Sequence, residues 1–112
     1  EGRVGSRIYG AGGKVFPSVA IDLIMKSLGK LGGIVAQCQV VQREPGALVF
    51  HVEPGVRTGA VERRRVERLL DEAVPRYYGS AMRHEGRFVE AIPRRGEKFL
   101  EFISEVPPEL RY

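Results

Sequence analysis

The stretch Gly33–Glu53, GIVAQCQVVQREPGALVFHVE, predicts the two central strands of this chain. Its first half alternates like a half-buried strand, and one side would carry Ile34, Ala36, Cys38 and Val40. The other side would carry Gln37 and Gln39. The second half, ALVFHVE, alternates in the same way and is expected to bury Leu48, Phe50 and Val52. Between the halves, Pro45 precedes Gly46, the order that a type II turn prefers, so the stretch predicts two strands joined by a turn.

A helix is predicted on each side of these strands. Before them, Pro17 opens the segment SVAIDLIMKSL (18–28), and the glycines that follow it end the helix. Its apolar residues share one face: Ala20, Ile21, Ile24, Met25 and Leu28. After the strands, AVERRRVERLLDEAV (60–74) has an apolar stripe at helical spacing, formed by Val66, Leu69, Leu70 and Ala73.

Short elements near the two ends complete the predicted order. Ile8–Tyr9 and Lys14–Phe16 flank GAGG (10–13), which predicts a small hairpin closed by glycines free to adopt positive φ. SAMRH (80–84) and RFVEAIP (87–93) are candidates for the third and fourth strands. The predicted order is a hairpin followed by α-β-β-α-β, an α+β fold with helices packed on a three- to four-stranded sheet.

Length and composition predict a single domain over residues 1–112, with one modest core. A hydrophobic content of 43% and a charged content of 29% are typical of a soluble globular chain. No apolar run approaches the ~18 residues that a membrane-spanning helix needs. The single Cys38 cannot form an internal disulfide, which favours a reducing compartment, and we expect the cytoplasm. The chain opens on Glu1 without a signal-like segment, so we expect it to be part of something longer.

A net charge of +4 and an isoelectric point near 9.6 raise the question of nucleic-acid binding. The segment 60–74 contains four arginines, but it also contains four acids: Glu62, Glu67, Asp71 and Glu72. Arg63 lies four residues before Glu67, the spacing of an ion pair on a helix. Arg68 is spaced in the same way from Asp71 and Glu72. We interpret the segment as a solvated, salt-bridged face, because a nucleic-acid patch should carry one sign of charge.

Residues with catalytic or metal-binding chemistry are few. His51 and His84 lack the Cys/His spacing of a metal site, and we expect none. Cys38 lies on the apolar side of its strand, so we interpret it as a buried structural thiol. Two glycine-rich places remain, GAGGK (10–14) and RRGEK (94–98), each ending in a lysine. Backbone N–H groups beside an ammonium often hold phosphate-like anions, although such loops are more often simply turns.

The order of these motifs resembles the C-terminal domain of adenylate-forming enzymes, in particular the phenylacetate–CoA ligase family. The opening GRVGSRIYGAGGKVFP (2–17) is similar to the family's junction between its large and small domains, of the form G-R-x-D-D-x-[IV]-x-x-x-G-x-x-[IV]-[FY]-P. The positions of that pattern are matched by Gly2, Arg3, Ile8, Gly12, Val15, Phe16 and Pro17. The run QCQVVQ (37–42) looks like a Q-x-x-Q-like run of the family. IPRRGEKFLEF (92–102) looks like the loop that carries the superfamily's terminal lysine.

The resemblance implies a two-step ligase reaction. A small carboxylic acid, an aromatic one included, attacks ATP bound with Mg2+ to give an acyl-adenylate and pyrophosphate. A thiol, usually that of coenzyme A, then displaces AMP. The acid pocket and most ATP contacts would belong to a large N-terminal adenylation domain that is outside this chain. The chain alone is therefore expected to be inactive.

The same resemblance implies roles for individual residues. Lys98 would reach the acyl carboxylate and the phosphate oxygens during adenylation, where a slim, compact cation can offset developing negative charge. Arg3 would contact the nucleotide. Gly12, Gly13 and Lys14 would line the tunnel through which the pantetheine arm reaches the adenylate, because glycine lets a thin arm pass close to the backbone.

A hinge within residues 2–7 is also implied, about which the small domain rotates between the two steps. Gly5 and Ser6 stand there in place of the family's acidic pair, and Glu97 stands where the family prefers glycine before the lysine. Two alternatives stay open. One is a degenerate or free-standing domain with an interaction or regulatory role, and the other is a small basic nucleic-acid-binding domain. We expect neither a nucleic acid nor a membrane as the partner.

Overall fold

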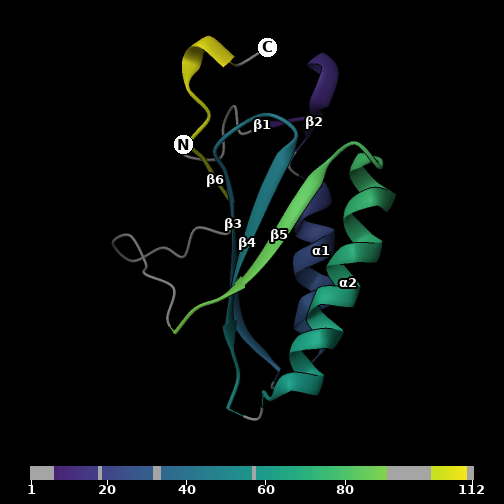
Figure 1. The fold of residues 1–112 in the computed structure, drawn as a ribbon, viewed down its shortest axis with the longest axis vertical. Helices are drawn as coiled ribbons and strands as arrows, with labels where there is room; N and C mark the ends of the chain where they lie inside the picture. Colours follow the sequence, from purple (N-terminus) through teal and green to yellow (C-terminus); the bar gives the residue numbers. More distant parts are fainter. Residues whose placement is uncertain (1–6, 18, 32–33, 57, 91–101, 111–112) are drawn as a thin grey trace.

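The computed structural model describes residues 7–17, 19–31, 34–56, 58–90 and 102–110 (Figure 1). The first three strands are β1 (Arg7–Tyr9), β2 (Val15–Pro17) and β3 (Val35–Gln42), and the others are β4 (Ala47–Pro54), β5 (Arg83–Phe88) and β6 (Phe102–Ser104). The α-helices are α1 (Val19–Gly29) and α2 (Ala60–Tyr78), and two 3₁₀ turns are η1 (Ala11–Gly13) and η2 (Pro108–Leu110). The predicted order of a hairpin followed by α-β-β-α-β is confirmed.

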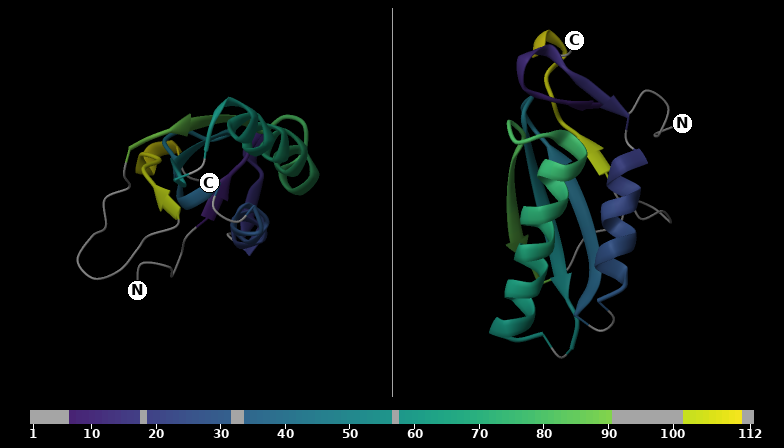
Figure 2. Two further views of the ribbon diagram at one scale, coloured as in Figure 1. Left: turned by 90° about the horizontal axis from the view of Figure 1, so that it is seen from below. Right: turned by 90° about the vertical axis from the view of Figure 1, so that its right-hand side faces the viewer.

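The strands form two sheets. β1 and β2 pair as an antiparallel hairpin, and the larger sheet has the order β5-β4-β3-β6. Within it β3 and β4 are antiparallel, whereas β5 is parallel to β4 and β6 is parallel to β3. Because parallel neighbours need a long connection, α2 crosses over between β4 and β5. Both helices lie on one face of this sheet (Figures 1 and 2), so the predicted α+β fold is confirmed.

The hydrophobic core lies between the helices and the larger sheet. β4 buries Leu48, Phe50 and Val52, as predicted. The helices contribute Ile21, Ile24, Leu28, Val66, Leu70, Val74 and Tyr78. Burial of side chains of this size stabilises the fold by about 1.5–3 kcal/mol each before the entropy of ordering is subtracted. Neither α1 nor α2 is long and apolar enough to cross a membrane.

The sequence interpretation of the third and fourth strands is wrong. The segments 80–84 and 87–93 supply one strand, β5, and the fourth strand of the sheet is β6, further along the chain. Gly86 is not a break between two strands, because it lies in the middle of β5 facing α2. A Cβ added there would lie 3.4 Å from Leu70 Cδ1, at about van der Waals contact, so Gly86 lies directly against the helix.

β3 also departs from the expected alternation. Its pairing with β4 shifts between Val35 and Gln37, which indicates a bulge. Ile34, Cys38 and Val40 are buried as expected, but Ala36 is exposed because the irregularity interrupts the side-to-side alternation.

Helix α2 runs one turn further than the segment 60–74 that the apolar stripe marks, and it includes Pro75. It ends where Gly79 adopts a φ of 88° and donates its N–H to Pro75 O at 2.9 Å. The extra turn buries Tyr78, whose ring meets the ring of Phe16 edge-on at a centroid distance of 5.2 Å. The end of α2 is therefore packed against the hairpin.

Candidate functional site

The glycine turn, Gly10–Lys14, forms the tip of the β1–β2 hairpin. Tyr9 pairs with Val15 at the end of the ladder, and the turn is closed by Gly10 N–H donating to Lys14 O at 2.8 Å. Gly12 and Gly13 have φ values of 72° and 88°, so the predicted positive φ is confirmed at both positions. L-residues, which carry a Cβ, rarely adopt this region, which explains two successive glycines here.

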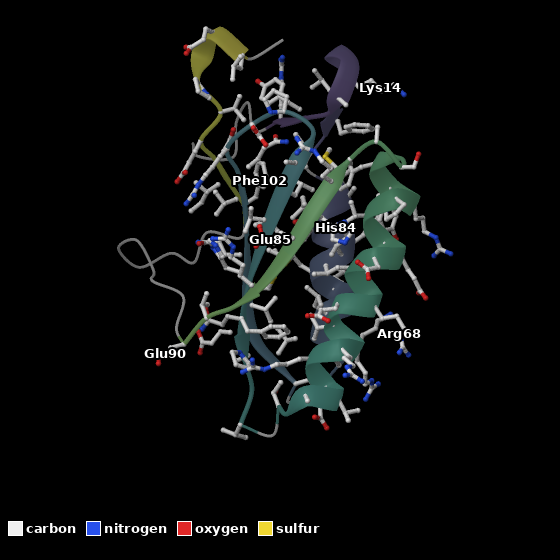
Figure 3. The ribbon with its side chains drawn as sticks, in the orientation of Figure 1. Lys14, Arg68, His84, Glu85, Glu90 and Phe102 are labelled. Atoms are coloured by element: carbon white, nitrogen blue, oxygen red, sulfur yellow. The ribbon has the colours of Figure 1, made fainter. Side chains whose placement is uncertain are left out.

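The tip of the turn is an open stretch of backbone. A Cβ added at Gly12 or Gly13 would meet no atom within 4 Å, and both residues are exposed. Lys14 is exposed beside them and points away from the body of the domain (Figure 3). Its ammonium forms no ion pair with any residue that the structure describes. The tip therefore presents unshielded backbone and one available positive charge.

The base of the hairpin is fixed by burial and by a glutamine that the sequence interpretation did not single out. Ile8 is fully buried, and Phe16 packs against the core. The fully buried Gln42 side chain bonds both backbone groups of Tyr9, at 2.8 Å each. The signal in the sequence was a polar residue that ends an apolar alternation directly before a turn.

Three of the predicted site residues lie within the described part of the chain. Gly12, Gly13 and Lys14 lie side by side in the glycine turn. Arg3, Gly5, Ser6 and Lys98 lie outside the described residues, so the hinge and the lysine loop stay predictions. The chain after Lys98 returns to the sheet as β6, which pairs with β3 from Val40 to Gln42.

The charged face of α2 differs from the prediction. Neither Arg63 with Glu67 nor Arg68 with the following acids forms an ion pair among the described residues. The guanidinium of Arg63 instead lies 4.9 Å from the centre of the Phe88 ring. Asp71 Oδ1 lies at hydrogen-bond distance, 2.7 Å, from Nε2 of His84 on β5 (Figure 3). These side chains reach across to the strand rather than along the helix.

The sheet face opposite the helices carries charges of both signs. Arg87 bonds Glu85 at 2.8 Å, which lowers the pKa of that carboxyl. Arg43 pairs with Glu105 at 3.1 Å. Burial, and then the positive charges of Arg87 and Arg43, lower the pKa of His51. Among the described residues this face therefore carries charges of both signs.

The other candidates for chemistry within the described ranges are Cys38 and the two histidines. Cys38 is buried, as expected for a structural thiol. No group of three or more His, Cys, Asp or Glu side chains in the described part of the chain is arranged to hold a metal ion. No family model, curated protein or solved structure matches the chain. The glycine turn is the part of the predicted site that lies within the described residues.

Proposed function

We propose that this chain is the mobile C-terminal domain of an ATP-dependent carboxylic acid–thiol ligase resembling the phenylacetate–CoA ligases. The observation that carries the proposal is the open backbone at Gly12 and Gly13, set on a buried hairpin base with Lys14 beside it. A two-stranded hairpin followed by a helix and an α+β sheet is the architecture that the resemblance implies. The substrates of the full enzyme would be ATP with Mg2+, a small carboxylic acid and coenzyme A, in the cytoplasm.

The geometry of the glycine turn suits the second half-reaction. A pantetheine arm is narrow and flexible, so it needs a path beside backbone that carries no side chains. The 4 Å clearance at the Cβ positions of Gly12 and Gly13 provides such a surface. The exposed ammonium of Lys14 can attract the phosphates at the far end of coenzyme A, because a lysine on a flexible stem acts as a point charge for phosphate.

The first half-reaction is proposed to depend on Lys98. Its ammonium would meet the acyl carboxylate and the α-phosphate, with Arg3 on the nucleotide. Rotation about residues 2–7 would exchange this arrangement for the one in which the glycine turn faces the site. The acid, its pocket and most nucleotide contacts belong to the proposed N-terminal adenylation domain.

The test uses the full-length enzyme, with the two half-reactions measured separately. Gly12→Asn adds a side chain to the tip while keeping a residue that tolerates the left-handed conformation. We expect thioester formation from pre-made acyl-adenylate to fall about 10-fold or more, the scale of a one-group misfit in a binding path, while ATP–pyrophosphate exchange stays near the wild-type rate. If the variant carried out each half-reaction at the wild-type rate, the proposal would be contradicted and an interaction role for the domain would be favoured.

A further inference from the structure

Gln42 is a buried polar side chain at the junction of the two sheets. It is the last residue of β3, and its relative exposure is 0%. Its partner Tyr9 ends β1, 33 positions earlier in the chain. A primary amide that is fully withdrawn from water must have its hydrogen-bonding groups satisfied inside the protein.

The Gln42 amide acts as an extra segment of strand. Its Oε1 accepts from Tyr9 N–H at 2.8 Å, and its Nε2 donates to Tyr9 O at 2.8 Å. This two-point pairing has the pattern that two strands make at a hydrogen-bonded pair. The second Nε2 hydrogen is directed to Ala47 O, at 3.2 Å, on the first residue of β4.

The turn between β3 and β4 adds a backbone bond to the same place. Gly46 N–H donates to Tyr9 O at 2.7 Å. Gly46 has a φ of 80°, and a Cβ added there would lie 3.5 Å from Ala11, the first residue of the glycine turn's 3₁₀ segment. One end of the larger sheet is therefore joined to the hairpin directly below its tip.

We infer that Gln42 is a positioning residue for the glycine turn: it fixes the direction in which Gly12–Lys14 project from the larger sheet. The hairpin and the larger sheet have no strand pair in common among the described residues, so their relative orientation depends on such contacts. Under the proposed function, on which this step rests, domain rotation would present the turn to the thiol arm as part of one rigid body. An error of about 1 Å in such a position is enough to slow a reaction by about 10²-fold.

The first experiment measures the hairpin in this chain by NMR. Gln42→Met keeps the length of the side chain but removes its donors and its acceptor. We expect the amide resonances of Tyr9, Gly12 and Gly13 to shift and exchange of the Tyr9 amide hydrogen to accelerate about 10-fold, the scale of one net hydrogen bond. Gln37→Met is the matched control, because Gln37 lies toward the other end of β3 and its Oε1 has no hydrogen-bond partner among the described residues. The control should leave the hairpin resonances unchanged.

A second variant keeps the inference testable if Gln42→Met fails to fold. In Gln42→Glu the protonated carboxyl offers one donor and one acceptor, as the pairing with Tyr9 requires, whereas the carboxylate can only accept. Burial at this position should raise the pKa of the introduced carboxyl, so relative to wild type at the same pH its hairpin resonances should be closer to native at pH 5 than at pH 8. Resonances at Gly12 and Gly13 that match wild type in both variants, or a displacement of Gln42→Glu that does not depend on pH, would overturn the positioning role.

The full-length ligase separates this inference from the function on which it rests. We expect Gln42→Met to raise the KM for the thiol while the rate of adenylation is unchanged, a split that general loss of stability would not produce. If the hairpin resonances move and thioester formation does not respond, Gln42 positions the turn but the proposed role of the turn is wrong. If the resonances do not move, the positioning inference itself is wrong.

Discussion

The ring of Tyr78 meets the ring of Phe16 edge-on, at 5.2 Å between centroids and an interplanar angle of 86°, and so joins the end of α2 to the hairpin. The hydroxyl of Tyr78 is buried at this contact without a hydrogen-bond partner among the described residues. An unsatisfied buried hydroxyl is destabilising, whereas the ring is stabilising. The two parts of one side chain therefore contribute opposite terms.

Substitution can separate these terms. Tyr78→Phe removes only the hydroxyl, and we expect the free energy of unfolding to rise by about 1–2 kcal/mol. Tyr78→Ala removes the ring as well and should lower it by about 3–5 kcal/mol. Urea denaturation at pH 7 measures both. A loss of more than about 1 kcal/mol in Tyr78→Phe would mean that the hydroxyl has a partner in solution.

Gly10 is required for a steric reason that differs from that of its neighbours. Its φ of −89° is open to any residue, but a Cβ there would lie 2.7 Å from Phe16 Cε2. Gly10→Ala must displace the ring from its contact with Tyr78, and we expect it to cost about 1–3 kcal/mol in thermal or urea unfolding. Gly29→Ala is the control, since a Cβ at that position meets nothing within 4 Å. Equal stabilities of the two variants would refute this packing.

Much of the fold follows from local sequence pattern. The alternation on β4 and the apolar stripe of α2 are each strong enough to predict an element and its buried face, because the periods of a strand and a helix differ. The two candidate segments 80–84 and 87–93 were separated wrongly, because one sequence does not show whether the residues between them, including Gly86, end a strand or continue it. Local pattern can mark Gln42 as an unusual residue, but it does not show that its partner is Tyr9, far earlier in the chain.

The site was predictable only in part for the same reason. Positive φ at Gly12 and Gly13 is a local property of a glycine-rich turn, and it was foreseen. The partners of the charged side chains could not be predicted. The spacing on a helix shows which residues are close to one another along α2, but it does not show which side chains of β5 lie beside them. The guanidinium of Arg63 lies over the ring of Phe88 on β5 instead of pairing with the expected carboxylate of Glu67.

The contact between Arg63 and Phe88 gives a third prediction. A cation over an aromatic ring at an exposed position contributes about 0.5–1 kcal/mol, so Arg63→Ala should lower the free energy of unfolding by that amount. Arg64→Ala is the matched control, because Arg64 is exposed on the next position and has no ion pair or ring contact within the described ranges. In a Phe88→Leu background, the difference between the two arginine variants should disappear. A difference that persists there would exclude the ring as its cause.

The pH dependence of stability supplies a fourth test. Burial and two arginines lower the pKa of His51 below its ordinary 6.5, so the folded protein binds a proton at this site less readily than the unfolded chain. Well above pH 6.5, His51 therefore does not reduce the free energy of unfolding. That free energy falls as the pH drops through 6.5 toward the lowered pKa of His51. We expect His51→Gln to reduce this acid-side slope in urea denaturation between pH 7.5 and 5. A slope identical to that of wild type would show that His51 is not the titrating group.

The last prediction concerns Lys98, which the resemblance assigns to adenylation and which lies outside the described residues. In the full-length enzyme, Lys98→Ala should lower ATP–pyrophosphate exchange by about 10²-fold or more, the scale of losing one preorganised electrostatic contact. Under the proposed function, thioester formation from pre-made acyl-adenylate should persist, because the domain would then be rotated and the glycine turn would face the site. Lys98→Arg should not restore exchange, since a planar guanidinium does not replace a compact ammonium on a slim stem. Lys14→Ala provides the reciprocal control: its loss should weaken the thiol step and leave exchange intact. Wild-type exchange in Lys98→Ala would remove the lysine from the mechanism and would leave Glu97, before it, as a sign that this loop has lost the adenylation function.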